Sequence, residues 1–459
     1  MFGLVNLVKR RMGKGLLAVV AIVTAMRGFD ALAAPPRGAF DQDLVVANDG
    51  ALWGGSIATF SAGSKGNSAP KYLNILLNDV AQQFSGVAVS PKTGENFVVE
   101  SFGLAVLEFS PTANARKLPQ SRPQVIIDGD NTGLVFPEGV AFDSKQDPIV
   151  DTSGQFYVAN NCSTLPKSGN YCSSMMCTTS PDEIDGKVTV FNAGARGNAA
   201  PNLTIEGCNT SLGGPIGIFV DEATVSVCIG SAATAADLCN PANGNVIVPV
   251  PTRRIWVVND EAVDNNPDDL AFGTVTIYAP ELAFVLSLSN CADNPQTGQP
   301  VCDEAPLGGM FSTAGEGDTP DFTSIPQFIA VNQDESSAYV TDADFGRVKA
   351  FDLTSAPNCM TTDAGGNCRV AIDKYITGAY RASIFGRHTL LKSPLGVSVK
   401  STAEGDELFV ADLRNRILEF GPQAALNGGD LAPIAQLKGG RTRLNEPIGV
   451  AVSPPQLIP

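Results

Sequence analysis

Histidine is almost absent from this chain: among 459 residues, His388 is the only copy. A zinc site made of several histidines is therefore excluded. A Ser-His-Asp triad would have to use His388, and the chain has no Gly-x-Ser-x-Gly sequence to present a serine nucleophile. We interpret His388 as a residue of a surface loop.

Positive charge is also scarce. The chain has 31 Lys and Arg against 47 Asp and Glu, which gives a formal net charge of -16. Such a field repels nucleic acid and anionic lipid, so neither is expected as a partner. A small molecule, a glycan or another protein remains open as the partner. Solubility in an extracellular setting is the alternative reason for the charge.

Long apolar runs are missing after residue 33. Before it, a basic segment (9–14), an apolar stretch (15–26) and a small-x-small sequence ending at Ala33 predict a signal peptide over residues 1–33. An uncleaved membrane anchor is the alternative. Cleavage would remove five cations and one acid and move the net charge from -16 to -20. We expect a secreted or periplasmic protein that is not embedded in the membrane after cleavage.

All ten cysteines lie between Cys162 and Cys368, in the part that would be exported. An even number in an oxidising compartment predicts five disulfides. Closeness in the sequence suggests three pairs: Cys228 with Cys239, Cys291 with Cys302, and Cys359 with Cys368. The other four allow three connectivities, among which spacing does not choose: Cys162, Cys172, Cys177 and Cys208.

The 46 Gly and 31 Pro punctuate a repeated unit of short β-branched and aromatic strands. The first strand of the unit recurs as GVAVS (86–90), GVAFD (139–143), GIFVD (217–221), FIAVN (328–332), GVSVK (396–400) and GVAVS (449–453). The second recurs as LVVAN (44–48), FVVE (97–100), FYVAN (156–160), IWVVN (255–259), AYVTD (338–342) and LFVAD (408–412). The third ends in an aromatic residue six times, as in SIATF (56–60) and KVTVF (187–191). Six copies predict six four-stranded sheets.

This unit resembles the NHL repeat of bacterial exported β-propellers. The best match is GKVTVFNAGARGNAAPNLTIEGCNTSLGGPIGIFVD (186–221), with a Gly-Asn-x-Ala-Pro turn and an Asn-Thr-x-Leu-x-x-Pro connector. The resemblance implies an all-β, six-bladed β-propeller over residues 41–456, preceded by a lead at 34–40. Since the chain begins with a second-type strand and ends with a first-type strand, we expect the last strand to complete the first blade.

Strand alternation then sorts the loops onto two faces. We call top the face where second strands lead to third strands and where one blade leads to the next. There we expect the loop 161–185, the acidic loop 259–269, the connection 289–325 and the segment 377–393. The insertions 222–253 and 352–369 are expected on the opposite, lower face. Propeller ligands usually bind at the top, so we predict binding or scaffolding through the loop-rich top face.

Six oxygen-bearing residues end the second strands and would ring the top: Asn48, Glu100, Asn160, Asn259, Asp342 and Asp412. One interpretation is a cation or polyol site. The other is that each side chain caps its own following turn through backbone amides.

Calcium-dependent lactonases of the gluconolactonase type share the propeller architecture, and their metal ligands come from the channel mouth near the start of the first strand. At those positions only Glu138 and Gln327 could ligate here, whereas Ca²⁺ takes six or more oxygens. A calcium-dependent lactonase or hydrolase is therefore the alternative function, and a purely structural surface protein is a third. Calcium is the cofactor that this alternative would need.

Three further runs carry metal-like residues. The loop 259–269 could bind calcium weakly through Asp260, Asp264 and Asp268, although a solvated loop is the plainer interpretation. DGDNTG (128–133) imitates part of a calcium loop but lacks its terminal Glu. Cys172 and Cys177 could bind Cu(I), but disulfides are expected in an oxidising compartment.

Overall fold

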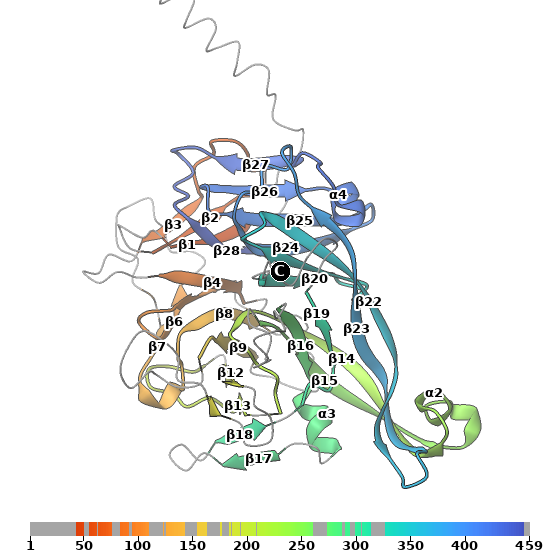
Figure 1. The fold of residues 1–459 in the computed structure, drawn as a ribbon. Helices are drawn as coiled ribbons and strands as arrows, with labels where there is room; N and C mark the ends of the chain where they lie inside the picture. Colours follow the sequence, from red (N-terminus) through yellow and green to blue (C-terminus); the bar gives the residue numbers. More distant parts are fainter. Residues whose placement is uncertain are drawn as a thin grey trace, which may run out of the picture.

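The protein is all-β, and its short strands gather into sheets that face one another around a common centre (Figure 1). The computed structural model describes residues 43–49, 55–61, 63–75, 83–90, 94–109, 123, 125–142, 154–162, 175–176, 183–184, 186–192, 194–207, 209–259, 273–286, 290–293, 299–303, 305–313 and 326–453. Within these residues, no helix is long and apolar enough to cross a bilayer.

Three sheets have four antiparallel strands each. The first has the order β28 (Pro447–Val452), β1 (Leu44–Asn48), β2 (Ser56–Phe60), β3 (Tyr72–Ile75). The second has the order β4 (Phe84–Val89), β5 (Asn96–Glu100), β6 (Ala105–Phe109), β7 (Val125–Ile127). The third has the order β24 (Pro394–Thr402), β25 (Gly405–Asp412), β26 (Arg416–Phe420), β27 (Ala435–Lys438).

The other repeats lie in larger sheets. A six-stranded sheet has the order β17 (Asn290–Asp293), β18 (Pro300–Asp303), β13 (Leu203–Ile205), β12 (Lys187–Asn192), β9 (Gln155–Asn160), β8 (Pro137–Phe142). An eight-stranded sheet has the order β14 (Pro215–Ala232), β15 (Val246–Asn259), β16 (Thr274–Tyr278), β19 (Gly309–Ser312), β23 (Cys368–Ile384), β22 (Arg347–Thr362), β21 (Ser337–Asp342), β20 (Pro326–Val331). A small pair joins β10 (Met175–Met176) to β11 (Glu183–Ile184). The sheets are thus less uniform than the repeat predicts, because a hairpin extends one and the long β23 joins two others.

The first strands of the repeats lie side by side in a cycle: β28 contacts β4, then β8, β14, β20 and β24 follow, and β24 contacts β28. Their glycines explain the Gly-Val start of the repeat. A Cβ on Gly139 would lie 2.3 Å from the carbonyl oxygen of Ile216, and one on Gly396 would lie 2.4 Å from that of Ile448. Neighbouring backbones therefore approach too closely for any side chain at these positions.

The two ends of the described chain meet in one sheet. Strand β28 pairs antiparallel with β1, from Leu44 opposite Val452 to Asn48 opposite Pro447. This pairing of β28 with β1 buries apolar side chains of both strands, among them Val46 and Val450, in a cluster that also contains Phe409 of β25. The core therefore lies between neighbouring sheets, each of which is too small to bury its faces alone.

Four connectors between repeats share the sequence Gly-x-x-Thr-x-Leu-x-x-Pro. The buried Thr of each, as in Thr210, donates to the Gly carbonyl and accepts from the Leu N–H; in Thr210 these distances are 2.7 and 3.3 Å. The residue between Thr and Leu has a left-handed φ of 66°, 55°, 65° and 58° in Gly133, Ser211, Leu390 and Arg443. The four connectors thus have the same backbone conformation at this position, although the residue type there differs from one connector to the next.

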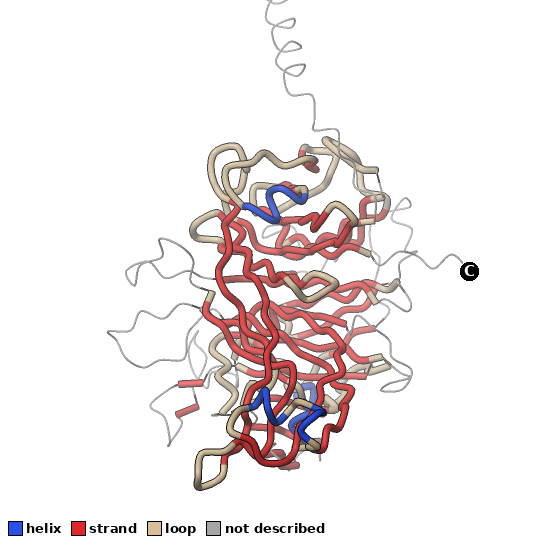
Figure 2. The backbone as a smooth tube through the Cα atoms, turned by 90° about the vertical axis from the view of Figure 1, so that its right-hand side faces the viewer, coloured by secondary structure: helices blue, strands red, loops and turns tan. Residues whose placement is uncertain are grey.

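Two long hairpins project from one side of the body as an arm (Figures 1 and 2). Strands β14 and β15 form one hairpin and β22 and β23 the other, and β14 pairs with β23 between them. The insertions 222–253 and 352–369, expected as loops, are largely strands, because their β-branched residues continue the pairing beyond the body. Residues 377–384 belong to β23, which corrects the expected loop 377–393.

The arm carries two disulfides and a short helix, α2 (Ala235–Leu238). The predicted pairs Cys228–Cys239 and Cys359–Cys368 are confirmed. Both disulfides contribute to one small core with Leu238. Cys162 and Cys302 are also in disulfides, and Cys291 lies opposite Cys302 in the pairing of β17 with β18. Cys172, Cys177 and Cys208 lie outside the described residues.

The outer edge of β15 is interrupted by two prolines. Pro249 and Pro251 lie opposite Ser226 and Thr224 of β14. Further along the edge, the Arg253 N–H donates at 3.1 Å to Glu281 of α3 (Pro280–Val285). Helix α3 packs its Leu282 and Ala283 on the base of the arm.

Candidate functional site

The six residues that end the second strands are all buried, with exposed fractions from 0% to 5%. In three of them the side-chain oxygen accepts a backbone N–H from the connector that enters the same sheet. Asn48 accepts from Asn445 at 3.1 Å, Asn160 from Val135 at 3.0 Å, and Asn259 from Gly213 at 3.2 Å. Each donor lies in the connector, two residues before the first strand of that sheet begins. The contact therefore fastens the connector to the sheet.

The acidic members at these positions vary the arrangement. Asp412 accepts from Lys392 and Ser393 of the incoming connector, and also from Arg414 of its own turn. Asp342 accepts from Phe345 of its own turn and pairs with Arg347 at 2.9 Å. Capping of the following turn therefore holds for the three acidic residues, Glu100 included through the Gly103 N–H, whereas the asparagines hold residues that are distant in the sequence. Binding of a ligand by these six stays a prediction.

Burial raises the pKa of the Glu100 carboxyl, while hydrogen bonds from the Gly103 and Gln83 backbones act in the opposite direction. Of the two residues expected at the channel mouth, Glu138 accepts from the Ser101 hydroxyl at 3.3 Å. Gln327 lies on β20, with its carbonyl oxygen against Gly217. Within the described ranges, no group of three or more His, Cys, Asp or Glu could hold a metal ion. Asp260, Asp264 and Asp268 lie outside those ranges, so they stay predictions.

The structure brings polar side chains together at a place that the sequence did not indicate. A cavity of about 600 Å³ lies between the β20–β21 turn, the β24–β25 turn and α4 (Pro422–Asn427), and Arg381 of β23 forms one wall. Both turns connect a first strand to a second strand, so the cavity opens on the lower face, beside the base of the arm.

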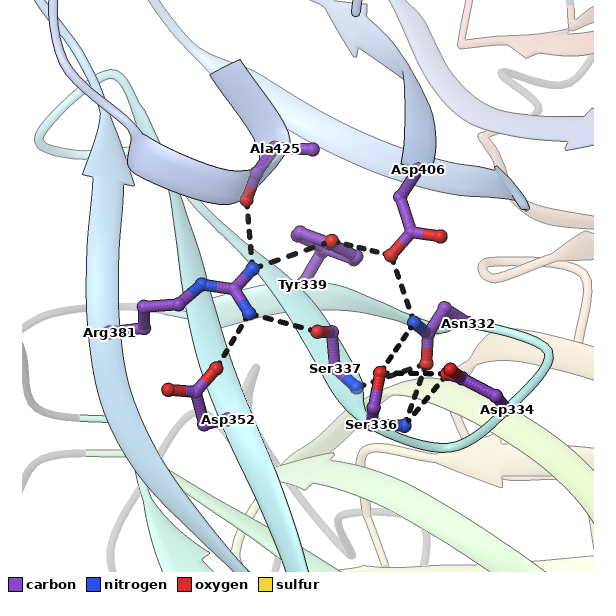
Figure 3. A network of polar contacts seen from close by, with 9 residues as sticks. All are labelled: Asn332, Asp334, Ser336, Ser337, Tyr339, Asp352, Arg381, Asp406 and Ala425. Atoms are coloured by element: carbon purple, nitrogen blue, oxygen red, sulfur yellow. Dashed lines mark hydrogen bonds and ion pairs between the residues drawn. The ribbon is translucent and has the colours of Figure 1, made fainter. Parts of the chain in front are cut away.

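The floor of this cavity is a connected set of hydrogen bonds (Figure 3). Asp406 accepts from the Tyr339 hydroxyl at 2.7 Å and from the Asn332 amide at 2.9 Å. Its other oxygen accepts from Ser401 at 3.0 Å. Burial, and then the contact with Asp406, raise the pKa of Tyr339, so its hydroxyl stays protonated at neutral pH.

The Arg381 guanidinium forms the wall by bonding in three directions (Figure 3). It donates to Asp352 at 2.6 Å, to Ser337 at 2.9 Å and to the Ala425 carbonyl at 2.8 Å. These contacts join β22, β21 and α4. The side chain is therefore held in one orientation beside the Tyr339 ring, whose centroid lies 5.9 Å away.

The turn that carries Asp334 is fixed from two sides, by β25 and by β15. Asn332 reaches Asp406 of β25 on one side, and Glu335 pairs with the buried Arg254 of β15 at 2.5 Å on the other. Within the turn, Ser336 donates to Asp334 from its hydroxyl at 2.7 Å and from its backbone at 3.1 Å. These hydrogen bonds lower the pKa of Asp334, and the one from the Ser336 hydroxyl has the largest effect. The Asp334 carboxylate is therefore ionised at neutral pH.

Sequence reasoning missed this cavity because it assigned ligand binding to the top face. The available signal was the polar character of two equivalent turns, NQDESS (332–337) and STAEGD (401–406). Nothing in the sequence indicates that a residue as distant as Arg381 lies between them.

No protein-family model and no curated protein matches this chain. Among solved structures, a nidogen/laminin complex is similar with 10% identity, 90% of this chain and 98% of that chain covered, and a TM-score of 0.40. The periplasmic gluconolactonase of Pseudomonas aeruginosa is similar with 13% identity, coverage of 90% and 99%, and a TM-score of 0.40. A functionally unknown protein from Desulfotomaculum acetoxidans has 11% identity, coverage of 91% and 100%, and a TM-score of 0.36. The first two are β-propellers. These likenesses are distant and carry no inference about a ligand.

Proposed function

We propose that the chain is an exported six-bladed β-propeller that acts as a binding module, with the lower-face cavity as a ligand site. The six copies of the repeat and the cycle of six first strands support the blade count. The N-terminal segment and the disulfides support export. The signal peptide at 1–33, the lead at 34–40 and the propeller at 41–456 are parts of the same proposal.

The observation that carries the binding role is a polar floor held by its own hydrogen bonds, beside two lining side chains that have no partner among the described residues. Gln333 and Glu404 line the cavity and are exposed, and neither side chain bonds to any described residue. The floor beneath them is already satisfied by its own hydrogen bonds. Preorganised polar groups of this kind lose little entropy when a ligand binds.

The lining favours a neutral ligand rich in hydroxyl groups, such as a sugar. Carboxylate acceptors from Asp334, Glu404 and Asp406 outnumber the single guanidinium of Arg381, which disfavours an anion. Hydroxyl donors match these acceptors. Pro422 and the exposed Leu426 add apolar surface for the C–H face of a ring.

The test is saturation-transfer NMR of the mature protein with neutral oligosaccharides of glucose, galactose, mannose and N-acetylglucosamine. We expect at least one to bind, and we expect Q333A/E404A to weaken it by about tenfold, since two polar contacts are lost. Asp344→Ala removes an exposed acid from the opposite end of the same sheet and should leave binding unchanged. Failure of every sugar to bind, or binding that Q333A/E404A does not change, would remove this proposal.

Repeating the binding experiment in EDTA, together with an assay of lactone hydrolysis, separates the binding module from the calcium-dependent lactonase. Binding at the lower face needs no metal, so it should persist in EDTA. Lactone hydrolysis that EDTA or Glu138→Gln abolishes would favour the enzyme instead. Binding through the top-face loops stays a separate prediction, and sugar binding that survives Q333A/E404A would point there.

A further inference from the structure

A second cavity, of about 320 Å³, lies where the last repeat meets the first. Three cations line it, Lys71, Arg441 and Arg443, over an apolar base that includes Pro70 and Leu73. No acidic residue is among its lining residues. In a chain with a net charge of -16, this concentration of positive charge is unusual.

The backbone around this basic groove is fixed by contacts between the two repeats. Asn67 accepts the Arg441 N–H at 2.8 Å, and Gly66 accepts the Lys438 N–H at 2.8 Å. Thr442, between the two arginines, is buried and donates to the Gly439 carbonyl at 2.6 Å. The two arginine side chains therefore start from a rigid base.

Neither arginine is used by the fold. Both are exposed, and neither guanidinium bonds to a described residue. Lys71 differs, because it pairs with Asp43 at 3.0 Å. Two unmatched guanidinium groups thus line the groove beside one partly neutralised ammonium.

The other connectors show that this geometry does not require arginine. At the two equivalent positions they have Asn131 and Gly133, Asn209 and Ser211, and His388 and Leu390. Arg443 also has a φ of 58°, a left-handed conformation in which glycine is favoured over a long side chain. The basic pair is therefore specific to this connector, and one member is held against its backbone preference.

We propose that the basic groove binds an oxyanion group, as a sulfate, phosphate or carboxylate carried by a small molecule. Guanidinium forks match such groups with paired hydrogen bonds, and Lys71 adds a point charge. The negative field of the distant surface is screened over about 8 Å at physiological ionic strength, so the local cations dominate at the groove.

Titration calorimetry of the full mature protein with inorganic sulfate, inorganic phosphate, acetate and glucose 6-phosphate tests the proposal. We expect binding of at least one of these anions and a loss of about tenfold or more in R441N/R443G, because charge-assisted bonds are removed. That variant gives this connector the residues of Asn131 and Gly133, so its melting temperature should not fall. The four probes distinguish a tetrahedral ion, a carboxylate and a phosphate ester.

The control is R387G/R414N, which removes two exposed arginines elsewhere and changes the net charge equally. It should bind the anion as the unaltered protein does. Absence of binding by the unaltered protein at millimolar anion would overturn the proposal, as would equal binding by R441N/R443G or equal weakening by the control. The sugar experiment on the lower-face cavity is independent of all these outcomes.

Discussion

Asn48 at the end of β1 accepts a hydrogen bond from the backbone of Asn445, which lies 397 positions later in the chain. The same contact joins Asn160 to Val135 and Asn259 to Gly213. The three asparagines at the ends of second strands are therefore explained by the connectors that they hold. Its burial makes each contact costly to remove.

Asn160→Ala should lower the free energy of unfolding by about 2–4 kcal/mol, because it leaves the Val135 N–H and several buried acceptors without a partner. Urea unfolding followed by tryptophan fluorescence measures the loss. The exposed Asn131 offers a matched control, and N131A should change stability by less than about 0.5 kcal/mol. Equal effects of the two substitutions would contradict the assigned role.

Arg254→Met should destabilise the fold by about 3–5 kcal/mol. The substitution leaves Asp221 and Glu335 without their buried cation. It should also weaken any ligand of the lower-face cavity, because Glu335 no longer holds the turn that carries Asp334. Chemical denaturation and the NMR titration measure the two effects, and a stable variant with intact binding would show that the ion pair is dispensable.

Asp49→Asn should stabilise the protein at neutral pH. Burial, and then the nearby Glu446, raise the pKa of Asp49 to about 6. A raised pKa means that the folded state favours the protonated form, so the stabilisation is complete below about pH 4 and is lost as the pH rises through about 6. Melting temperatures should therefore differ between the two proteins at about pH 7.5 and converge at about pH 4. A difference that is independent of pH would exclude this explanation.

Removal of residues 447–459 should abolish a folded monomer, because β28 supplies the first strand of the sheet that contains β1. The loss exposes one edge of β1 and the cluster around Val46. Size-exclusion chromatography and circular dichroism should show aggregation or exchange of strands between molecules. A shortened chain that melts cooperatively at the original temperature would contradict the proposed need for the β28–β1 pairing.

Removal of Cys359–Cys368 by paired serine substitution should loosen the arm and leave the body intact. The disulfide and its neighbour form the small core around Leu238, which is separate from the clusters between the sheets. Hydrogen exchange should therefore accelerate in residues 354–376 and stay unchanged in β1 and β26. Uniform acceleration throughout the chain would mean that the arm folds together with the body.

The strands were predictable because each copy of the repeat is a short run of β-branched and aromatic residues between turn residues. LVVAN and SIATF coincide with β1 and β2. The arm was not predicted, since periodicity alone does not tell a long hairpin from a long loop. The lower-face cavity was not predicted either, because Arg381, Tyr339 and Asp406 come from three strands whose proximity depends on how two sheets stack.

The prolines of β15 have a consequence for how the arm meets other molecules. In this register Pro249 and Pro251 occupy positions whose N–H groups would point away from β14, and Glu281 already takes the Arg253 N–H. A foreign strand approaching that edge finds almost no donors to continue the ladder. This edge of the arm is thus protected against strand addition and against edge-to-edge pairing with a second copy.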